Sequence, residues 1–228
     1  MTTDLQDAMW KNKPDRIAKA KEEALVALKV GNTASFHSIM LSAYITALGG
    51  KPVERHPPVK FFLLALWHAL CMSRQLRELN HNQLDVWLQF MLKLRSKLGP
   101  FKGIINGMLT EGAPRAIARA EADGKPHQRA LASMTYAEVT HAVNADQRLV
   151  EVSIKFALNR EEEIRAEPDQ PQGLRQFVRV LRKAGELYGK LGDKEKQRQY
   201  LNQAYELARG EADASDQVYK IYLLLAKL

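Results

Sequence analysis

Residues 83–98 read QLDVWLQFMLKLRSKL, and this stretch decides the fold class. Apolar side chains recur in it every three or four positions, at Leu84, Trp87, Leu88, Met91 and Leu92. This spacing places them on one face of an α-helix, whereas a half-buried strand would alternate apolar and polar residues. The same helical spacing extends outward in both directions, and no segment between turn signals alternates with a period of two. The sequence therefore predicts an all-α protein of roughly nine or ten helices.

Turn residues predict where the helices before this stretch begin and end. Gly31 separates a helix over 15–30 from one that runs to Leu48. The proline-rich segment KPVERHPP, residues 51–58, then connects to a long helix over 59–79.

After residue 98 the glycines and prolines predict shorter helices, at 101–110 and 114–122. Thr135-Tyr-Ala-Glu138 has the spacing of a capping box and predicts the start of a long helix over about 136–166. Further helices are expected over the ranges 174–190, 194–209 and 215–228.

The segment EPDQPQG, residues 167–173, has the clearest linker composition in the chain. It predicts a domain boundary, with a helical bundle over 1–166 and a smaller helical hairpin with a final helix over 174–228. A chain of 228 residues is long enough for two such parts.

Residues 178–211 resemble one tetratricopeptide repeat, a 34-residue helix–turn–helix unit. The turn of the unit matches Gly192-Asp193, and the helices match at Gly185, Tyr188, Tyr200, Ala204 and Leu207. The sequence departs from the family pattern at Gln197 and Arg209, and no second copy lies 34 residues earlier. The resemblance implies that the first helix of the hairpin lines a surface that binds peptides or partner proteins.

Basic residues lie on this implied surface. Arg179, Arg182 and Lys190 match the concave face of the family, and Arg175, Arg179 and Arg182 share one helix face by spacing alone. Forked guanidinium groups suit carboxylates or phosphates. The alternative is that these arginines form a solvated face or pair with Glu161–Glu163.

The net charge of +8, from 34 Lys+Arg and 26 Asp+Glu, is unevenly distributed. Residues 1–130 carry a balance of +8 and residues 131–228 a balance of zero. The second part is itself divided, because 131–169 carry −4 and 170–200 carry +5. Such concentrations bear on the partners of a protein rather than on its fold.

The basic residues of 93–130 give an alternative function, the binding of DNA or RNA. Between residues 93 and 130 three acids stand against eight basic residues: Lys93, Arg95, Lys97, Lys102, Arg115, Arg119, Lys125 and Arg129. Such clustering favours a phosphate backbone through counterion release. The aromatic residues nearby, Trp67, Trp87 and Phe90, stand on apolar faces and are expected in the core rather than as platforms for bases.

No residue pattern predicts catalysis, a metal or a cofactor. His68 and Cys71 are three apart on an apolar helix, but two ligands do not make a zinc site, and a buried, hydrogen-bonded His68 is the better expectation. Glu138 and His141 have the spacing of a di-iron ligand pair, but the chain has no second copy of it. The phosphate-binding and nucleophile motifs of common enzyme classes are also missing from the sequence.

A cytoplasmic protein without a membrane partner is expected. The most apolar stretch, Phe61–Met72, is 12 residues long, against about 20 for a bilayer span. The first residues lack the apolar core of a secretory signal. The leading functional hypothesis is a non-enzymatic interaction or adaptor protein, which binds an acidic segment of a partner through a basic helical face. A subunit of a nucleoprotein complex is the alternative, with 93–130 and 175–198 as its basic regions.

Overall fold

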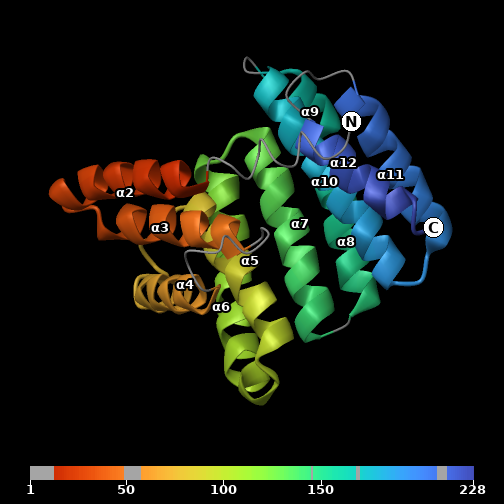
Figure 1. Ribbon diagram of the computed structural model, residues 1–228. Coiled ribbons are helices and arrows are strands. Elements are labelled where there is room, and N and C mark those ends of the chain that lie inside the picture. Colours follow the sequence, from red (N-terminus) through yellow and green to blue (C-terminus); the bar gives the residue numbers. More distant parts are fainter. Residues whose placement is uncertain (1–12, 49–57, 145, 168–169, 210–214) are drawn as a thin grey trace. The chain divides into compact units, whose positions relative to one another are not determined.

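The structure is a computed structural model that describes residues 13–48, 58–144, 146–167, 170–209 and 215–228. These residues form helices and turns with no strand among them, which confirms the predicted all-α class. The chain divides into two compact units, residues 1–108 and 109–228 (Figure 1). The predicted connection at 51–58 lies, apart from Pro58, outside the described residues.

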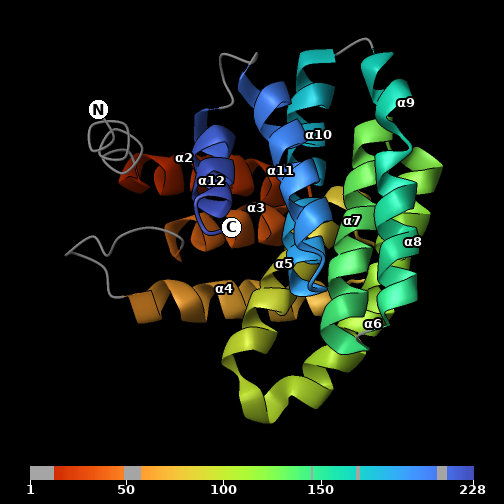
Figure 2. The ribbon, with the colours of Figure 1, turned by 90° about the vertical axis from the view of Figure 1, so that its right-hand side faces the viewer.

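The described residues of the first unit form four helices, a 3-10 turn and the start of a fifth helix. In chain order these are α2 (Lys13–Lys29), α3 (Thr33–Leu48), α4 (Pro58–Ser73), α5 (His81–Lys97), the 3-10 turn η1 (Gly99–Phe101) and α6 (Lys102–Asp123). Helix α3 packs between α2 and α4, and α5 packs against α3 and α4 (Figures 1 and 2). Gly31 ends α2 as the sequence predicts, because it adopts the left-handed φ of 76° that favours glycine.

Local hydrogen bonds fix the position of α5. The Asn80 side chain accepts the Gln83 backbone N–H at 3.0 Å, and the Gln83 side chain accepts the Asn80 N–H at 2.9 Å, which closes a capping box. Trp87 is fully buried, and its indole Nε1 donates to the Ala69 carbonyl of α4 at 3.0 Å. The register of α5 against α4 is therefore set by a buried hydrogen bond as well as by apolar packing.

The second unit is a row of helices. Its members after α6 are α7 (Pro126–Val143), α8 (Gln147–Leu158), α9 (Glu161–Arg165), α10 (Gln170–Lys190), α11 (Lys194–Arg209) and α12 (Ser215–Leu225). Figure 2 shows α10 between α7 and α11, with α8 beyond α7 and α12 beyond α11. One continuous apolar core runs through the row, and Phe177, Leu187 and Tyr188 of α10 lie at its centre.

Two predicted short helices, 101–110 and 114–122, are one helix in the structure. Helix α6 continues through Pro114, although proline lacks the N–H that would bond to the carbonyl of Thr110. Its buried residues follow one helix face: Ile105, Leu109, Ala113, Ala116 and Ala120. Because this face is packed along its whole length, tertiary contacts offset the loss of one backbone hydrogen bond.

The predicted long helix over 136–166 is wrong, since the structure divides this region into α7, α8 and α9. The expected capping box at Thr135 fails because Thr135 is buried inside α7 and Glu138 pairs with Lys183 of α10. Helix α8 has its own N-cap, where the Asp146 side chain accepts the Leu149 N–H at 3.1 Å. The predicted helix over 59–79 also ends earlier, at Ser73.

The segment predicted as a linker lies inside the second unit. Glu167 is buried, and its carboxylate accepts the backbone N–H of His127 at 2.9 Å and contacts the His127 ring Nδ1 at 2.7 Å. It therefore caps the start of α7 from 40 residues away. Helix α10 already begins at Gln170, so part of the segment whose composition suggested a boundary is helical. No helix in the described ranges combines the length and apolarity that crossing a bilayer requires.

Candidate functional site

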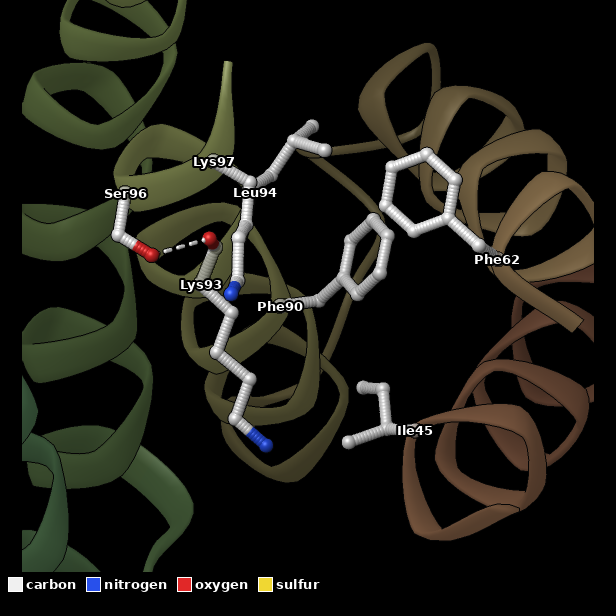
Figure 3. Close-up of a pocket in the computed structure, with 7 residues that line it drawn as sticks. All are labelled: Ile45, Phe62, Phe90, Lys93, Leu94, Ser96 and Lys97. Carbon is white, nitrogen blue, oxygen red and sulfur yellow. Dashed lines mark hydrogen bonds between the residues drawn. The ribbon is translucent and has the colours of Figure 1, made fainter. Parts of the chain in front are cut away.

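A pocket of about 370 Å³ opens between α3, α4 and α5 in the first unit (Figure 3). Its apolar surface comes from Ile45 of α3, from Phe62 of α4, and from Phe90 and Leu94 of α5. In Figure 3 the Phe62 and Phe90 rings lie near one another, with Ile45 beside Phe90. The pocket therefore offers a volume suited to one or two large apolar side chains.

Basic residues stand at the edge of this pocket. Lys93, Ser96 and Lys97 complete its lining, and both lysines are exposed. They follow Phe90 and Leu94 by three positions each, so one stretch of α5 presents apolar and cationic groups side by side. No acidic side chain belongs to the lining that the structure describes. The arrangement suits a ligand that is apolar in one part and anionic in another.

The eight residues of the predicted nucleic-acid region are shared between the two units. Lys93, Lys97 and Lys102 of the first unit are exposed, whereas Arg95 donates to Asn106 at 2.7 Å. In the second unit Arg119 and Lys125 are exposed; Arg115 pairs with Glu111 at 3.0 Å and Arg129 donates to the Gly124 carbonyl at 3.0 Å. Several of the predicted phosphate ligands are thus already engaged within the protein.

The four predicted partner-binding residues of α10 differ in exposure. Arg182 donates to Glu186 and to Gln217 of α12, and only 16% of its side chain is exposed. Arg175 and Arg179 are partly buried, and Arg179 donates to Gln176 at 2.6 Å. Lys190 is exposed. The arginines do not pair with Glu161–Glu163 in any contact described; Glu161 pairs with Arg165 at 2.7 Å and Glu163 with Arg160 at 3.2 Å.

His68 is buried and hydrogen-bonded as predicted, and its partner is another histidine. The Nδ1 atoms of His37 in α3 and His68 in α4 lie 2.9 Å apart, so one ring donates and the other accepts. Burial, with the nearby His37, lowers the pKa of His68 to about 4, and burial also lowers the pKa of His37. The Tyr44 ring stacks on His68, with centroids 5.7 Å apart.

The remaining predictions for chemistry concern Cys71 and metals. Cys71 is partly buried and forms no disulfide. Burial and then the charge of Lys190 lower the pKa of His141, which lies on α7. Within the described ranges, no group of three or more histidine, cysteine or acidic side chains could hold a metal ion.

The pocket could not be found from the sequence. The sequence predicts Lys93 and Lys97 as nucleic-acid-binding residues. Their spacing does not indicate that Ile45 and Phe62 lie beside them, because Ile45 and Phe62 belong to other helices. Searches of protein-family models, curated proteins and solved structures find no match to this chain.

Proposed function

We propose that the protein is a non-enzymatic interaction protein whose first unit binds an acidic segment of a partner. An apolar side chain of that segment enters the pocket between α3, α4 and α5, and neighbouring carboxylates pair with Lys93 and Lys97. One observation carries the proposal: an apolar pocket of about 370 Å³ whose described edge holds two exposed lysines and no acid.

The two parts of the pocket contribute in different ways. Desolvation of an apolar anchor in a concave site supplies most of the affinity, at about 25 cal/mol per Å² of apolar surface removed from water. The exposed lysines form ion pairs of little net energy, typically below about 1 kcal/mol each. They instead select a partner with acidic residues beside its anchor and disfavour a basic one.

The distribution of charge supports an acidic partner for the first unit. Residues 1–108 hold 15 basic and 8 acidic residues, a balance of +7, whereas residues 109–228 hold 19 and 18, a balance of +1. Nearly all of the net charge thus belongs to the unit that contains the pocket. A field of this sign accelerates encounter with an acidic segment, and the acceleration falls as salt rises.

The primary contact is placed at Lys93 and Lys97 rather than on α10 because both lysines are exposed beside an apolar pocket. By contrast, only 16% of the Arg182 side chain is exposed. Lys190 is exposed on α10, so the predicted α10 face stays a second candidate contact.

A charge-reversal pair tests the proposal. The wild-type protein and Lys93→Glu/Lys97→Glu are used to purify partners from nuclease-treated extract, and the acidic segment of each candidate is synthesised for a titration. We expect the double variant to bind that segment at least about tenfold more weakly. The matched control, Lys155→Glu/Lys227→Glu, reverses two exposed lysines of the second unit that lie outside both candidate contacts and leaves this affinity unchanged. Equal losses in both variants would reject the pocket as the site.

Binding of DNA or RNA is the second candidate, because Lys93, Lys97 and Lys102 are exposed at the end of α5 and the start of α6. Filter binding at low salt tests it. If nucleic acid binds, log K falls with log salt by about one unit per phosphate contacted, and Lys102→Ala lowers the slope by about one. Absence of retention at low salt removes this candidate.

A further inference from the structure

Helix α4 presents an apolar face that nothing in the described structure covers. Leu63, Trp67 and Leu70 are 57%, 60% and 47% exposed, and their spacing of four and three places them on one side of the helix. The sequence predicted Trp67 in the core, and the structure shows that this is wrong. Large apolar residues that are exposed next to one another are typical of an interaction surface, whereas single exposed apolar residues are common on any protein.

The accessible part of α4 is apolar across more than this stripe. His68 is the single polar residue between Phe61 and Met72, and it is only 6% exposed because it faces His37 and Tyr44 of α3. Leu64 and Leu66 are partly exposed as well. Whatever covers this helix therefore meets a broad apolar surface rather than a narrow seam.

The charges at the two ends of this face are basic. In the sequence, Lys60 stands three positions before Leu63, and Arg74, which is exposed, directly follows the end of α4 at Ser73. No acidic residue occurs between Val59 and Arg77, and the whole unit has a balance of +7. The occupant of this face must therefore be apolar in its centre and anionic at its edges.

We propose that α4 docks the first unit onto a bilayer that contains anionic phospholipids. In this arrangement α4 lies in the plane of the interface, the stripe of Leu63, Trp67 and Leu70 enters the boundary between headgroups and acyl chains, and the flanking basic residues meet anionic headgroups. Tryptophan at the middle of the stripe suits this position, because its ring prefers the interface to the hydrocarbon core.

Two other occupants fit the face less well. A second copy of the chain would bring the basic ends of two α4 helices together, in either relative direction, and like charges repel. A single partner helix would cover a narrow stripe and leave the flanking leucines exposed, whereas a bilayer covers a broad face. The proposal differs from the acidic partner segment in its residues, since it uses the exposed Leu63, Trp67 and Leu70 of α4 and not Phe62 or the lysines of α5.

Vesicle co-sedimentation of the full chain tests the proposal. We expect binding to phosphatidylcholine vesicles that contain about one-third phosphatidylserine, weaker binding to phosphatidylcholine alone, and a decrease with salt. Leu63→Glu/Leu70→Glu should lower the partition coefficient at least about tenfold. Both positions are exposed, so the variant is expected to keep the far-ultraviolet circular dichroism of the wild type.

The control is Val152→Glu, which adds one negative charge at an apolar position of the second unit that is 56% exposed. It should leave vesicle binding unchanged. Emission of Trp67 gives a second readout: we expect a shift to shorter wavelength on adding the vesicles, and loss of that shift in Trp67→Phe. A wild-type protein that stays in the supernatant overturns the proposal, and so does a loss in Val152→Glu equal to that of the double variant. A lipid-free dimer that Leu63→Glu/Leu70→Glu converts to a monomer would assign the face to a second copy instead.

Discussion

At the scale of single residues, two glycines of α10 differ in the atoms that a larger side chain would meet. Gly185 and Gly189 both face α11, and the absence of a Cβ at each lets the two helices approach closely. A Cβ at Gly185 would lie 2.8 Å from Cγ of the buried Leu201 and 3.2 Å from the Gln197 carbonyl oxygen. The three atoms nearest to a Cβ at Gly189 all belong to the end of the flexible Gln197 side chain.

We therefore expect Gly185→Ala to lower the free energy of unfolding of the second unit by about 1–2 kcal/mol, because core and backbone atoms must shift. Gly189→Ala should be neutral or stabilising by up to about 1 kcal/mol, since alanine favours the helix and Gln197 can move aside. Urea denaturation of both variants measures the difference. Equal effects at the two positions would contradict this account of the helix contact.

The buried His37–His68 pair makes stability depend on pH. The pKa of His68 falls from 6.5 in an unfolded chain to about 4 in the folded protein, so the folded state disfavours its protonation. Stability is complete above pH 6.5 and is lost as the pH falls toward 4. We expect the first unit to lose about 2 kcal/mol between pH 7 and pH 5 from this residue.

Denaturant unfolding followed by tryptophan fluorescence at the two pH values measures this loss, because the buried Trp87 reports on the first unit. His68→Gln keeps hydrogen-bonding groups but does not titrate, so its dependence on pH should be smaller by about the same amount. A variant with the full dependence of the wild type would assign the effect to other groups.

At the scale of elements, α6 is a helix whose sequence does not favour it. Gly103 and Gly107 are exposed, and a Cβ at either position would meet no other atom within 4 Å. Each glycine therefore adds backbone entropy to the unfolded chain without serving a close contact.

We expect Gly103→Ala and Gly107→Ala each to raise the free energy of unfolding by about 0.5–1 kcal/mol. Thermal unfolding followed by circular dichroism at 222 nm (the far-ultraviolet helix band) measures the increase. Destabilisation by either change would mean that this face of α6 is covered in solution.

The start of α7 depends on a side chain that is distant in the sequence. The Glu167 carboxylate accepts from the backbone and ring of His127, and both residues are buried. Glu167→Ala leaves two buried nitrogen groups without this acceptor, so we expect a loss of about 3 kcal/mol. Glu162→Ala, at an exposed position of α9, should change stability by less than about 0.5 kcal/mol. Chemical denaturation compares the two, and equal losses would show that Glu167 behaves as a surface residue.

At the scale of the whole molecule, the chain divides into two compact units of different charge. The second unit has its own continuous apolar core, and it carries a buried ion pair between Lys183 of α10 and Glu138 of α7. The first unit carries a balance of +7 and the second +1. A chain with two compact units is expected to unfold in more than one step.

We expect a fragment of residues 102–228, cut ahead of α6, to fold alone with cooperative denaturation. Its midpoint should match one transition of the full chain, and lowering the pH to 5 should shift the other transition further, because His37 and His68 belong to the first unit. An unfolded fragment, or a single transition of the full chain at both pH values, would contradict the independence of the units.

The sequence alone determined the all-α class and the ends of several helices, since apolar spacing and turn residues are local properties. Gly31 ends α2 and Gly192 ends α10 where the sequence predicts, because both need a left-handed backbone. It also determined that His68 is buried. Tertiary contacts decided the rest. Helix α6 continues through Pro114 because one face of the helix is buried along its length. Glu167 is part of the second unit rather than of a linker because its carboxylate accepts the backbone N–H of His127, 40 residues earlier. The pocket beside Lys93 and Lys97, and the exposure of Trp67, depend on which helix faces which, and pairing between distant segments leaves no signal in the spacing of either one.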